Sequence, residues 1–470
     1  MKSVINIKMA PLVLLLIAMV GCNKKLDIQP RQSIDAATAL TTADDVEAAV
    51  VGAYSIMGGG ALYGTNLFLM ADLLAGDPAS GSSSAARYVT WSGTFQGQRQ
   101  IYNKTMTRDN SEASRTWIAG YRAINMANTV LDALNVVTDA SKKAQLEGEA
   151  LFIRGIMHFE LVRYYALPWG ATADNSQLGV VIRTKATKTE TEAFEKTPRN
   201  TVAQVYQQVI SDLTAAAAKL PANNGTRVTK YTAMAFLARV YLQQSDYAKA
   251  RDAANDVIQS GKYRMNASVR AVFDNKNTAE SIWEIQQNQQ NNAGTSNDGM
   301  ATFYASLPGI GRADVRIPTG FVNSYEPNDL RKQEWYYVGT GQRPGNTYNS
   351  KWTSFSQNLP VIRIAEMYLI RAETNLRLRT EEGDTPENDL AKVRNPIRTN
   401  LPFITNPMLK EDVLPERIFE LAYEGVRIHD IKRLKGKVGA LDWNDPKLVF
   451  PIPQRDIDAS EGVLVQNPGY

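Results

Sequence analysis

The sequence predicts a mainly α-helical protein, in which a scaffold of helical hairpins carries long irregular inserts and a few short strands. Apolar residues recur at steps of three and four through several long segments, as they do on one face of a helix. Two of these segments, within residues 229–262, are joined by a very short connection. Two other stretches, residues 58–109 and the region after Gln286, lose the helical period while keeping many aromatic residues.

The hairpin at residues 229–262 shows the architecture most plainly. Its two helical segments are separated only by residues 244–246, which makes them antiparallel neighbours. Small Ala238 and Ala250 allow the backbones to approach closely, and Tyr241 fills the space beside them. The pair follows the tetratricopeptide pattern, L-[GA]-x-x-Y and then D-Y-x-x-A. A single hairpin cannot bury its own apolar face, so other helices must flank it. The alternative is an ordinary hairpin in another kind of bundle.

The same periodicity, with its start and stop signals, defines the other elements in chain order. Alternating residues predict a short strand at 280–286. The tail from Leu448 is punctuated by Pro and is expected to contain no helix. The remaining helices are predicted at residues 42–57, 114–136, 141–165, 201–220, 361–378 and 413–434. Long loops inside a compact domain are functional or disordered, and the aromatic content of residues 58–109 favours function.

Composition limits the class of protein. The chain has 470 residues, long enough for one large domain or two to three ordinary ones. With 44% apolar and 21% charged residues it resembles a soluble globular protein. The net charge of +4 includes Lys2 and Lys8, which lie in a segment expected to be removed. We find no basic cluster with interleaved aromatic residues, so a nucleic-acid partner is not expected.

The N-terminus has the layout of an exported lipoprotein. Residues 1–21 combine a basic start, an apolar run from Met9 to Val20, and Gly21 directly before Cys22, the one cysteine of the chain. This arrangement resembles the bacterial lipobox, in which the cysteine becomes the new N-terminus and carries lipid. We therefore expect a signal peptide at 1–21 and lipid attachment at Cys22, which would anchor the protein firmly to a membrane. The alternative is a chance cysteine behind a signal that is cleaved elsewhere.

Five separated stretches resemble, in the right order, motifs of the SusD/RagB lipoproteins of bacterial nutrient uptake. Two departures occur, Ala166 in place of Gly and Ser460-Glu461 where Asn is commoner. The stretches are CNKKLDIQP at 22–30, QLEGEALFIRGIMHFELVRYYA at 145–166, LPVIR at 359–363 with EMYLIRAE at 366–373, ER at 416–417 with ELAYEGVR at 420–427, and PIP at 451–453 with QNPGY at 466–470.

The resemblance implies a SusD-like fold, a tetratricopeptide-like platform tethered by lipid to the outer membrane and facing the cell exterior. It also implies a partnership with a SusC-like TonB-dependent transporter, to which captured nutrient is passed. The nutrient is commonly an oligosaccharide and sometimes a peptide. The whole of 22–470 is then one SusD-like domain, with an N-terminal half at 22–220, the hairpin at 229–262 and a C-terminal half at 270–470.

Carbohydrate binding requires flat aromatic faces surrounded by hydrogen-bonding side chains. The Gly58–Asn103 insert supplies this mixture, and loops on a rigid scaffold are where binding residues usually lie. Phe303 and Tyr304, in the second insert, are expected to close over the same surface. By residue type and position, the candidate ligand-binding residues are Trp91, Tyr63, Asn66, Asp72, Asp77, Arg87, Tyr88 and Tyr304.

The sequence favours a binding protein over an enzyme. His158 and His429 lie in apolar helical stretches without partners at metal-site or triad spacing, which predicts core packing. Nucleophile-elbow and phosphate-loop motifs are not present. No catalytic residue, cofactor or metal ligand is therefore assigned, although a metal ion bracing a loop stays open. The acidic and basic residues at 416–427 are interpreted as ties between helices. The alternatives are a peptide-binding uptake lipoprotein and a glycoside hydrolase using carboxylates such as Asp72 and Asp77.

Overall fold

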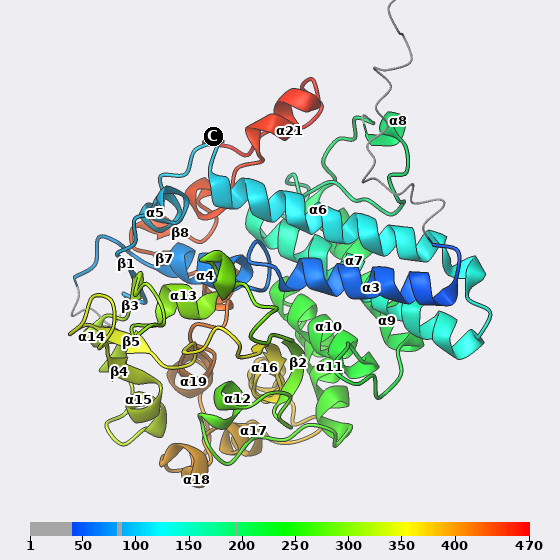
Figure 1. Ribbon diagram of the computed structural model, residues 1–470. Helices are drawn as coiled ribbons and strands as arrows, with labels where there is room; N and C mark the ends of the chain where they lie inside the picture. The colour runs from blue at the N-terminus through cyan, green and yellow to red at the C-terminus, as the bar shows by residue number, and fades with distance from the viewer. Residues whose placement is uncertain (1–39, 82–86, 194) are drawn as a thin grey trace, which may run out of the picture.

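The protein is described here by a computed structural model covering residues 40–81, 87–193 and 195–470 (Figure 1). The expected signal peptide and Cys22 lie outside these described residues. The longer helices are α3 (Ala43–Gly58), α4 (Asn66–Ala75), α5 (Gln96–Asn103), α6 (Ser111–Asp132), α7 (Ala140–Tyr165), α9 (Val202–Lys219), α10 (Lys230–Gln244), α11 (Tyr247–Gln259), α16 (Ile364–Leu378) and α17 (Pro386–Val393).

Short helices and strands fill the connections between them. The short helices are α8 (Glu190–Ala193), α12 (Ala271–Asp274), α13 (Met300–Tyr304), α14 (Thr319–Val322), α15 (Leu330–Glu334), α18 (Pro396–Thr399), α19 (Leu414–Glu420), α20 (Arg427–Arg433) and α21 (Gln454–Ala459). The strands are β1 (Thr90–Trp91), β2 (Ser281–Ile285), β3 (Val315–Arg316), β4 (Tyr336–Val338), β5 (Thr347–Asn349), β6 (Leu359–Arg363), β7 (Lys437–Val438) and β8 (Leu441–Asp442).

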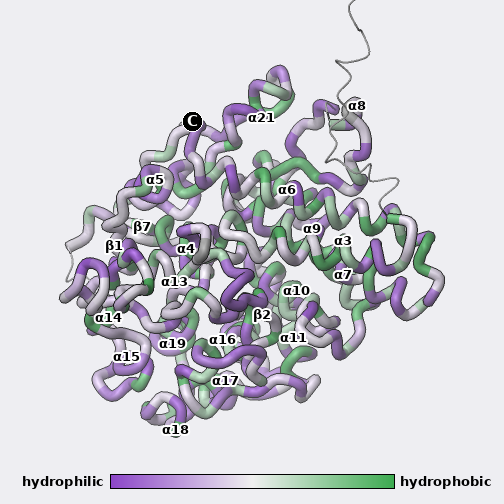
Figure 2. Tube along the Cα trace, viewed as in Figure 1, coloured by the Kyte–Doolittle hydropathy of each residue, from purple (hydrophilic) through white to green (hydrophobic). Residues whose placement is uncertain are grey.

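The long helices form a continuous stack, which confirms the predicted fold class. Helix α3 packs on α6, α6 on α7, α7 on α9, and the series continues through α10, α11, α16 and α17. Figure 2 shows hydrophobic residues interspersed with hydrophilic ones along these helices, as expected when each helix buries one face. No helix among the described residues is long and apolar enough to cross a bilayer.

The hairpin predicted at 229–262 is the α10–α11 pair. Thr229 caps α10 by accepting a hydrogen bond from the backbone N–H of Thr232, and Asp246 caps α11 in the same way through Lys249. Ser245 ends α10 in the left-handed conformation, with φ of 61°. Ala238 and Ala250 are completely buried, which is consistent with the close approach of the two backbones.

The predicted strand at 280–286 is also present, as β2. It pairs antiparallel with β6, and Trp283 on it lies in the core between Tyr63 and Phe152. The other strands form short two-stranded ribbons, β1 with β3, β4 with β5, and β7 with β8. Trp335 and Trp352 are buried as well.

The expectation that residues 58–109 are wholly irregular is wrong, because α4 and α5 lie within them. All ten residues of α4, NLFLMADLLA, are buried. A helix that is apolar around most of its circumference has no polar face, so it lacks the one-sided periodicity by which helices are recognised. The tail likewise contains an unexpected helix, α21.

The helix predicted at 413–434 is interrupted. Helix α19 ends at Glu420 and α20 begins at Arg427, and between them Tyr423 and Gly425 have φ values of 63° and 75°. A Cβ on Gly425 would lie 2.8 Å from the carbonyl oxygen of Leu67 in α4. Both the positive φ and this close approach require glycine. The predicted helix at 361–378 also begins later, since residues 359–363 form β6.

Buried ion pairs join the segments of the C-terminal half. The carboxylate of Glu420 accepts hydrogen bonds from three guanidinium groups, those of Arg331 at 3.2 Å, Arg363 at 3.1 Å and Arg398 at 2.7 Å. Burial alone would raise the pKa of Glu420, but the charges of Arg398, Arg363 and Arg331 outweigh it and hold this pKa well below its ordinary value. Arg363 also binds Glu424, at 2.8 Å.

A second buried chain of charges runs from α10 to α20. Glu366 binds Arg239 and Arg417, Arg417 binds Asp430, and Asp430 binds Arg433. Asp430 and Arg433 are one turn apart within α20, but the other contacts link separate elements.

The interpretation of residues 416–427 as ties between helices therefore agrees with the structure for Glu416, Arg417, Glu420 and Glu424, whose partners lie on other segments. Among the residues that the structure describes, Arg427 makes no ion pair, and it lies over the ring of Tyr88.

Candidate functional site

Six of the eight candidate ligand-binding residues lie in the interior. Asp77 and Arg87 are half-buried, whereas the others are at most 7% exposed. The expectation that the insert presents them as an open aromatic surface is therefore wrong for Tyr63, Asn66, Asp72, Tyr88, Trp91 and Tyr304.

These buried side chains hold the inserts to the scaffold or to each other. The hydroxyl of Tyr63 donates a hydrogen bond to Glu160 of α7 at 2.8 Å, and Asn66 donates to Glu112 of α6 at 3.0 Å. The ring of Trp91 packs 5.9 Å from that of Phe303. The tyrosines among the candidates do form hydrogen bonds, as their residue type indicated, but their partners are groups of the protein itself.

Asp72, Tyr88 and Tyr304 meet in one interior cluster. The hydroxyl of Tyr304 donates to Asp72 Oδ2 at 2.5 Å, and the backbone N–H of Tyr423 donates to the hydroxyl of Tyr88 at 2.6 Å. The rings of Tyr88 and Tyr423 stack with centroids 5.0 Å apart. Burial raises the pKa of Asp72 to about 8, with Tyr304, Lys351 and Tyr88 opposing that rise.

Asp72→Asn should flatten the pH dependence of stability. A carboxyl whose pKa is raised in the folded state favours folding below its unfolded pKa, and this contribution is lost as the pH rises towards 8. We expect the unfolding free energy of the wild type to fall by about 2–4 kcal/mol, relative to Asp72→Asn, between pH 5 and pH 8. Urea unfolding at both pH values measures this difference. Exposed Asp109→Asn is the matched control, and parallel pH profiles for wild type and Asp72→Asn would contradict the assignment.

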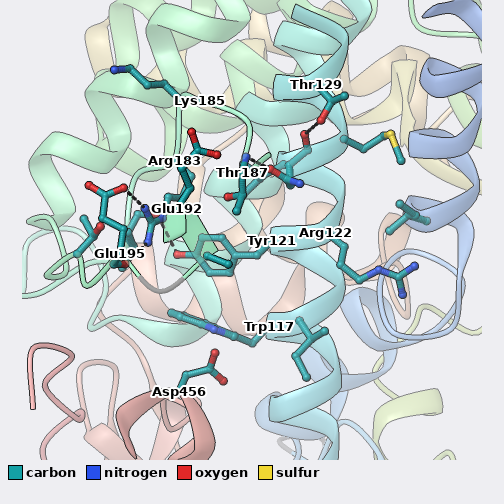
Figure 3. A pocket seen from close by; sticks show the side chains of 18 of the residues that line it. Trp117, Tyr121, Arg122, Thr129, Arg183, Lys185, Thr187, Glu192, Glu195 and Asp456 are labelled. Carbon is teal, nitrogen blue, oxygen red and sulfur yellow. Dashed lines mark hydrogen bonds and ion pairs between the residues drawn. The ribbon is translucent and has the colours of Figure 1, made fainter. Parts of the chain in front are cut away.

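A large open cleft lies elsewhere, across the first helices of the stack. Its volume is about 990 Å³, and its walls come from α3, α6, the segment 181–197 and the C-terminal part around α21 (Figure 3). Clefts of 300–1,000 Å³ are the usual size for small-ligand sites. The cleft is lined by both aromatic and polar side chains.

Two aromatic residues of α6 lie at the base of the cleft: Tyr121, which is half-buried, and Trp117 beside it, which is only 4% exposed. Trp117 and Tyr121 are one helical turn apart, with ring centroids separated by 4.8 Å, and Figure 3 shows Tyr121 directed towards the segment that carries Arg183. The Tyr121 hydroxyl donates to the carbonyl of Val181 at 2.9 Å. Burial raises the pKa of Tyr121, so its hydroxyl stays neutral. Asp456 of α21 lies beside Trp117 (Figure 3).

The wall at 181–197 is fixed to the scaffold by backbone contacts. Asn128 donates to the carbonyls of Arg183 and Lys185, both at 3.1 Å, and Asn125 accepts from the N–H of Thr187 at 2.7 Å. His158 Nε2 lies 3.2 Å from the N–H of Arg183, and burial lowers the pKa of this imidazole to about 4. The neutral ring therefore accepts that N–H, which assigns His158 a positioning role within the core.

The charges around the cleft are of both signs. Arg183 lies 3.7 Å from Glu195, and Arg455 lies 3.5 Å from Asp456. Arg122 on α6 is exposed at the rim. Mixed charges around flat rings suit an uncharged ligand rich in hydroxyl groups. Within the described ranges, the acidic, histidine and cysteine side chains form no group of three that could hold a metal ion.

Sequence reasoning missed this cleft. Trp117 and Tyr121 were expected only as part of the apolar face of a helix, because their spacing of four residues is that of any packed face. The other walls come from segments 60 to more than 300 residues away in the chain. Two aromatic residues on successive turns of one helix could have indicated a binding surface. Periodicity alone, however, does not distinguish a helix face that packs against the core from one that lines a cleft.

Comparison with known proteins gives a consistent result. Residues 74–242 match the family described as "Starch-binding associating with outer membrane", and residues 322–447 match the SusD family. The chain is 26% identical to a SusD-like protein of Formosa agariphila over 529 aligned residues, covering 97% of this chain and 98% of that protein.

Solved structures share the fold. A SusD superfamily protein from Bacteroides thetaiotaomicron is 25% identical, with a TM-score of 0.80, over 91% of this chain and 100% of its own. Surface glycan-binding protein A from Bacteroides uniformis is 21% identical, with a TM-score of 0.71, over 91% of this chain and 99% of its own.

The stack of hairpins with its aromatic-lined cleft defines a tetratricopeptide-like helical protein of the kind that holds ligands on a rigid scaffold. Together with the matches in both halves of the sequence and the agreement in fold, this places the chain in a known group. The chain belongs to the SusD/RagB family.

Proposed function

We propose that this protein captures an oligosaccharide at the cell surface and passes it, chemically unchanged, to a SusC-like TonB-dependent transporter in the outer membrane. The cleft that contains Trp117 and Tyr121 is the proposed binding site. A lipid on Cys22 is the proposed membrane anchor. Because capture and release change no covalent bond of the ligand, we assign no cofactor.

The aromatic pair in the cleft is the observation that carries this proposal. A sugar ring has apolar C–H patches that cover an aromatic face and hydroxyl groups that need partners around it. Tyr121 supplies a half-buried ring with the more deeply buried Trp117 packed beside it, while Arg122, Asn125 and Asp456 line the same cleft with donors and acceptors. The similar protein from Bacteroides uniformis is a surface glycan-binding protein, which supports the same ligand class.

Tyr121→Ala should weaken oligosaccharide binding by more than about tenfold. Covering roughly 100 Å² of an aromatic ring is worth about 2.5 kcal/mol, and each 1.4 kcal/mol changes affinity tenfold. Isothermal titration against a panel of hexasaccharides and short peptides measures the loss. Tyr231→Ala is the matched control, since Tyr231 is a half-buried tyrosine outside the cleft.

The same panel separates the competing functions. Binding of peptides alone would replace the carbohydrate proposal with a peptide-uptake role. Chromatography of the recovered ligand tests catalysis, because a glycoside hydrolase would return shortened products. If wild type and Tyr121→Ala bound a sugar with equal affinity, the cleft would not be the binding site of that sugar.

A further inference from the structure

A second groove lies farther along the stack, where α9 faces the turn between α10 and α11. Its volume is about 560 Å³. Trp169, from the segment after α7, forms one wall, Gln207 and Ile210 of α9 form the floor, and Tyr241, Gln244 and Asp246 form the other wall. None of its lining residues lines the cleft of Trp117 and Tyr121, so the two sites are separate.

Trp169 is held rigidly in its turn. Gly170, with φ of 83°, reverses the chain directly after it, and the Gly170 N–H donates to Asn175 at 2.5 Å. Gln177 donates to the carbonyl of Pro168, directly before it, at 2.8 Å. One part of the tryptophan packs against Tyr206, with ring centroids 5.0 Å apart, and the side chain is only half-buried. The turn therefore presents an aromatic surface whose position is fixed before any ligand arrives.

The opposite wall is equally fixed. The N–H of Asp246 donates back to the carbonyl of Tyr241 at 3.0 Å across the left-handed Ser245. Lys249 Nζ pairs with Asp246 at 2.8 Å and lies 5.5 Å from the ring centroid of Tyr241. The charges of Lys249 and Asp246 cancel, so the half-buried ring of Tyr241, the second aromatic ring of the groove, has no net charge beside it.

Two carboxamides complete the chemistry. Gln207 is exposed and Gln244 is half-buried, and among the described residues neither side chain makes a hydrogen bond. A carboxamide both donates and accepts, as a sugar hydroxyl does. Two rings, two free carboxamides and a neutralised ion pair match an uncharged sugar better than an anion or a cation.

We infer that this groove is a second carbohydrate-binding site, for an uncharged sugar unit, formed by Trp169, Tyr241, Gln207 and Gln244. The inference rests on the proposed function for its ligand class but assigns a different place on the scaffold.

Fluorine NMR of the full protein labelled with 5-fluorotryptophan tests both sites at once. The chain has seven tryptophans, and Trp117 reports on the cleft while Trp169 reports on the groove. Trp117→Phe and Trp169→Phe assign the two resonances. The probes are neutral hexasaccharides of glucose, galactose, mannose and xylose, with short peptides as the comparison. We expect one hexasaccharide to shift the Trp169 resonance in a saturable way.

The outcomes are distinct. Saturable shifts of both resonances support both sites. A shift of the Trp169 resonance alone supports the groove and contradicts sugar binding in the cleft. A shift of Trp117 alone overturns the groove and leaves the proposed function standing. A Trp169 response to peptides only, or no response of either tryptophan to any sugar, also overturns the inference.

A double variant keeps the test independent of folding. Gln207→Ala combined with Gln244→Ala removes two surface carboxamides, and we expect the Kd read from Trp169 to rise about tenfold while that read from Trp117 changes less than twofold. Exposed Gln333→Ala, on α15, is the matched control. An unchanged Kd at Trp169 in the double variant would contradict the role of the carboxamides.

Discussion

Replacing Glu420 with Gln should lower the unfolding free energy by about 3–5 kcal/mol, the usual cost of removing one partner from a buried ion pair. Glu420 is completely buried between Arg331, Arg363 and Arg398. Glutamine has nearly the same shape as glutamate, but it carries no negative charge to compensate the three buried guanidinium groups. Urea unfolding at pH 7 measures the loss.

Exposed Glu411→Gln is the control, because surface substitutions change stability by about 0.5 kcal/mol or less. If Glu420→Gln were as stable as this control, the cluster would be a packing feature whose charges contribute nothing. A double variant with Arg398→Met tests the pairing directly, since removing the third cation should recover part of the loss.

Cys22→Ala should move the whole protein from the membrane fraction to the soluble fraction. Each buried CH₂ of an acyl chain contributes about 0.8 kcal/mol, so two or more chains hold a globular body essentially permanently. Fractionation of a host that processes lipoproteins, followed by immunoblotting, measures the shift.

Gln29→Ala, a few residues after the expected lipidation site, is the control and should stay with the membrane. Membrane association of Cys22→Ala equal to that of wild type would show that something other than a lipid on this cysteine retains the protein. The experiment is independent of ligand binding, so it tests the anchor without the cleft.

The sequence predicted those parts of the fold that have a local cause. The α10–α11 hairpin and strand β2 were found because their periodicity and caps lie within a few residues of each other. Helix α4 was missed because its residues are apolar on almost every side. The break at Gly425 was missed because its cause, the carbonyl of Leu67, lies more than 350 residues earlier.

The candidate site was harder to predict than the fold, because residue type indicates chemistry but not exposure. Tyr63 and Tyr304 have side chains suited to sugars, yet Glu160 and Asp72 occupy their hydroxyl groups inside the protein. Tyr121 has the same chemistry and lines an open cleft only because the segment at 181–197 and α21 leave space beside α6. Spaces of that kind are set by how distant segments pack.

The enclosure of α4 has a consequence for how the chain matures. Its neighbours include Gly425 and, through Asp72, Tyr304, so its surroundings are complete only after nearly the whole polypeptide has been delivered. During synthesis from the N-terminus, α5, α6 and α7 reach α4 early, but the side that faces α20 and Gly425 stays uncovered until the end. Exposed apolar segments of this kind invite aggregation, and chaperones protect them. A chain shortened before residue 421 would therefore leave that apolar side of α4 exposed and should be removed by quality control.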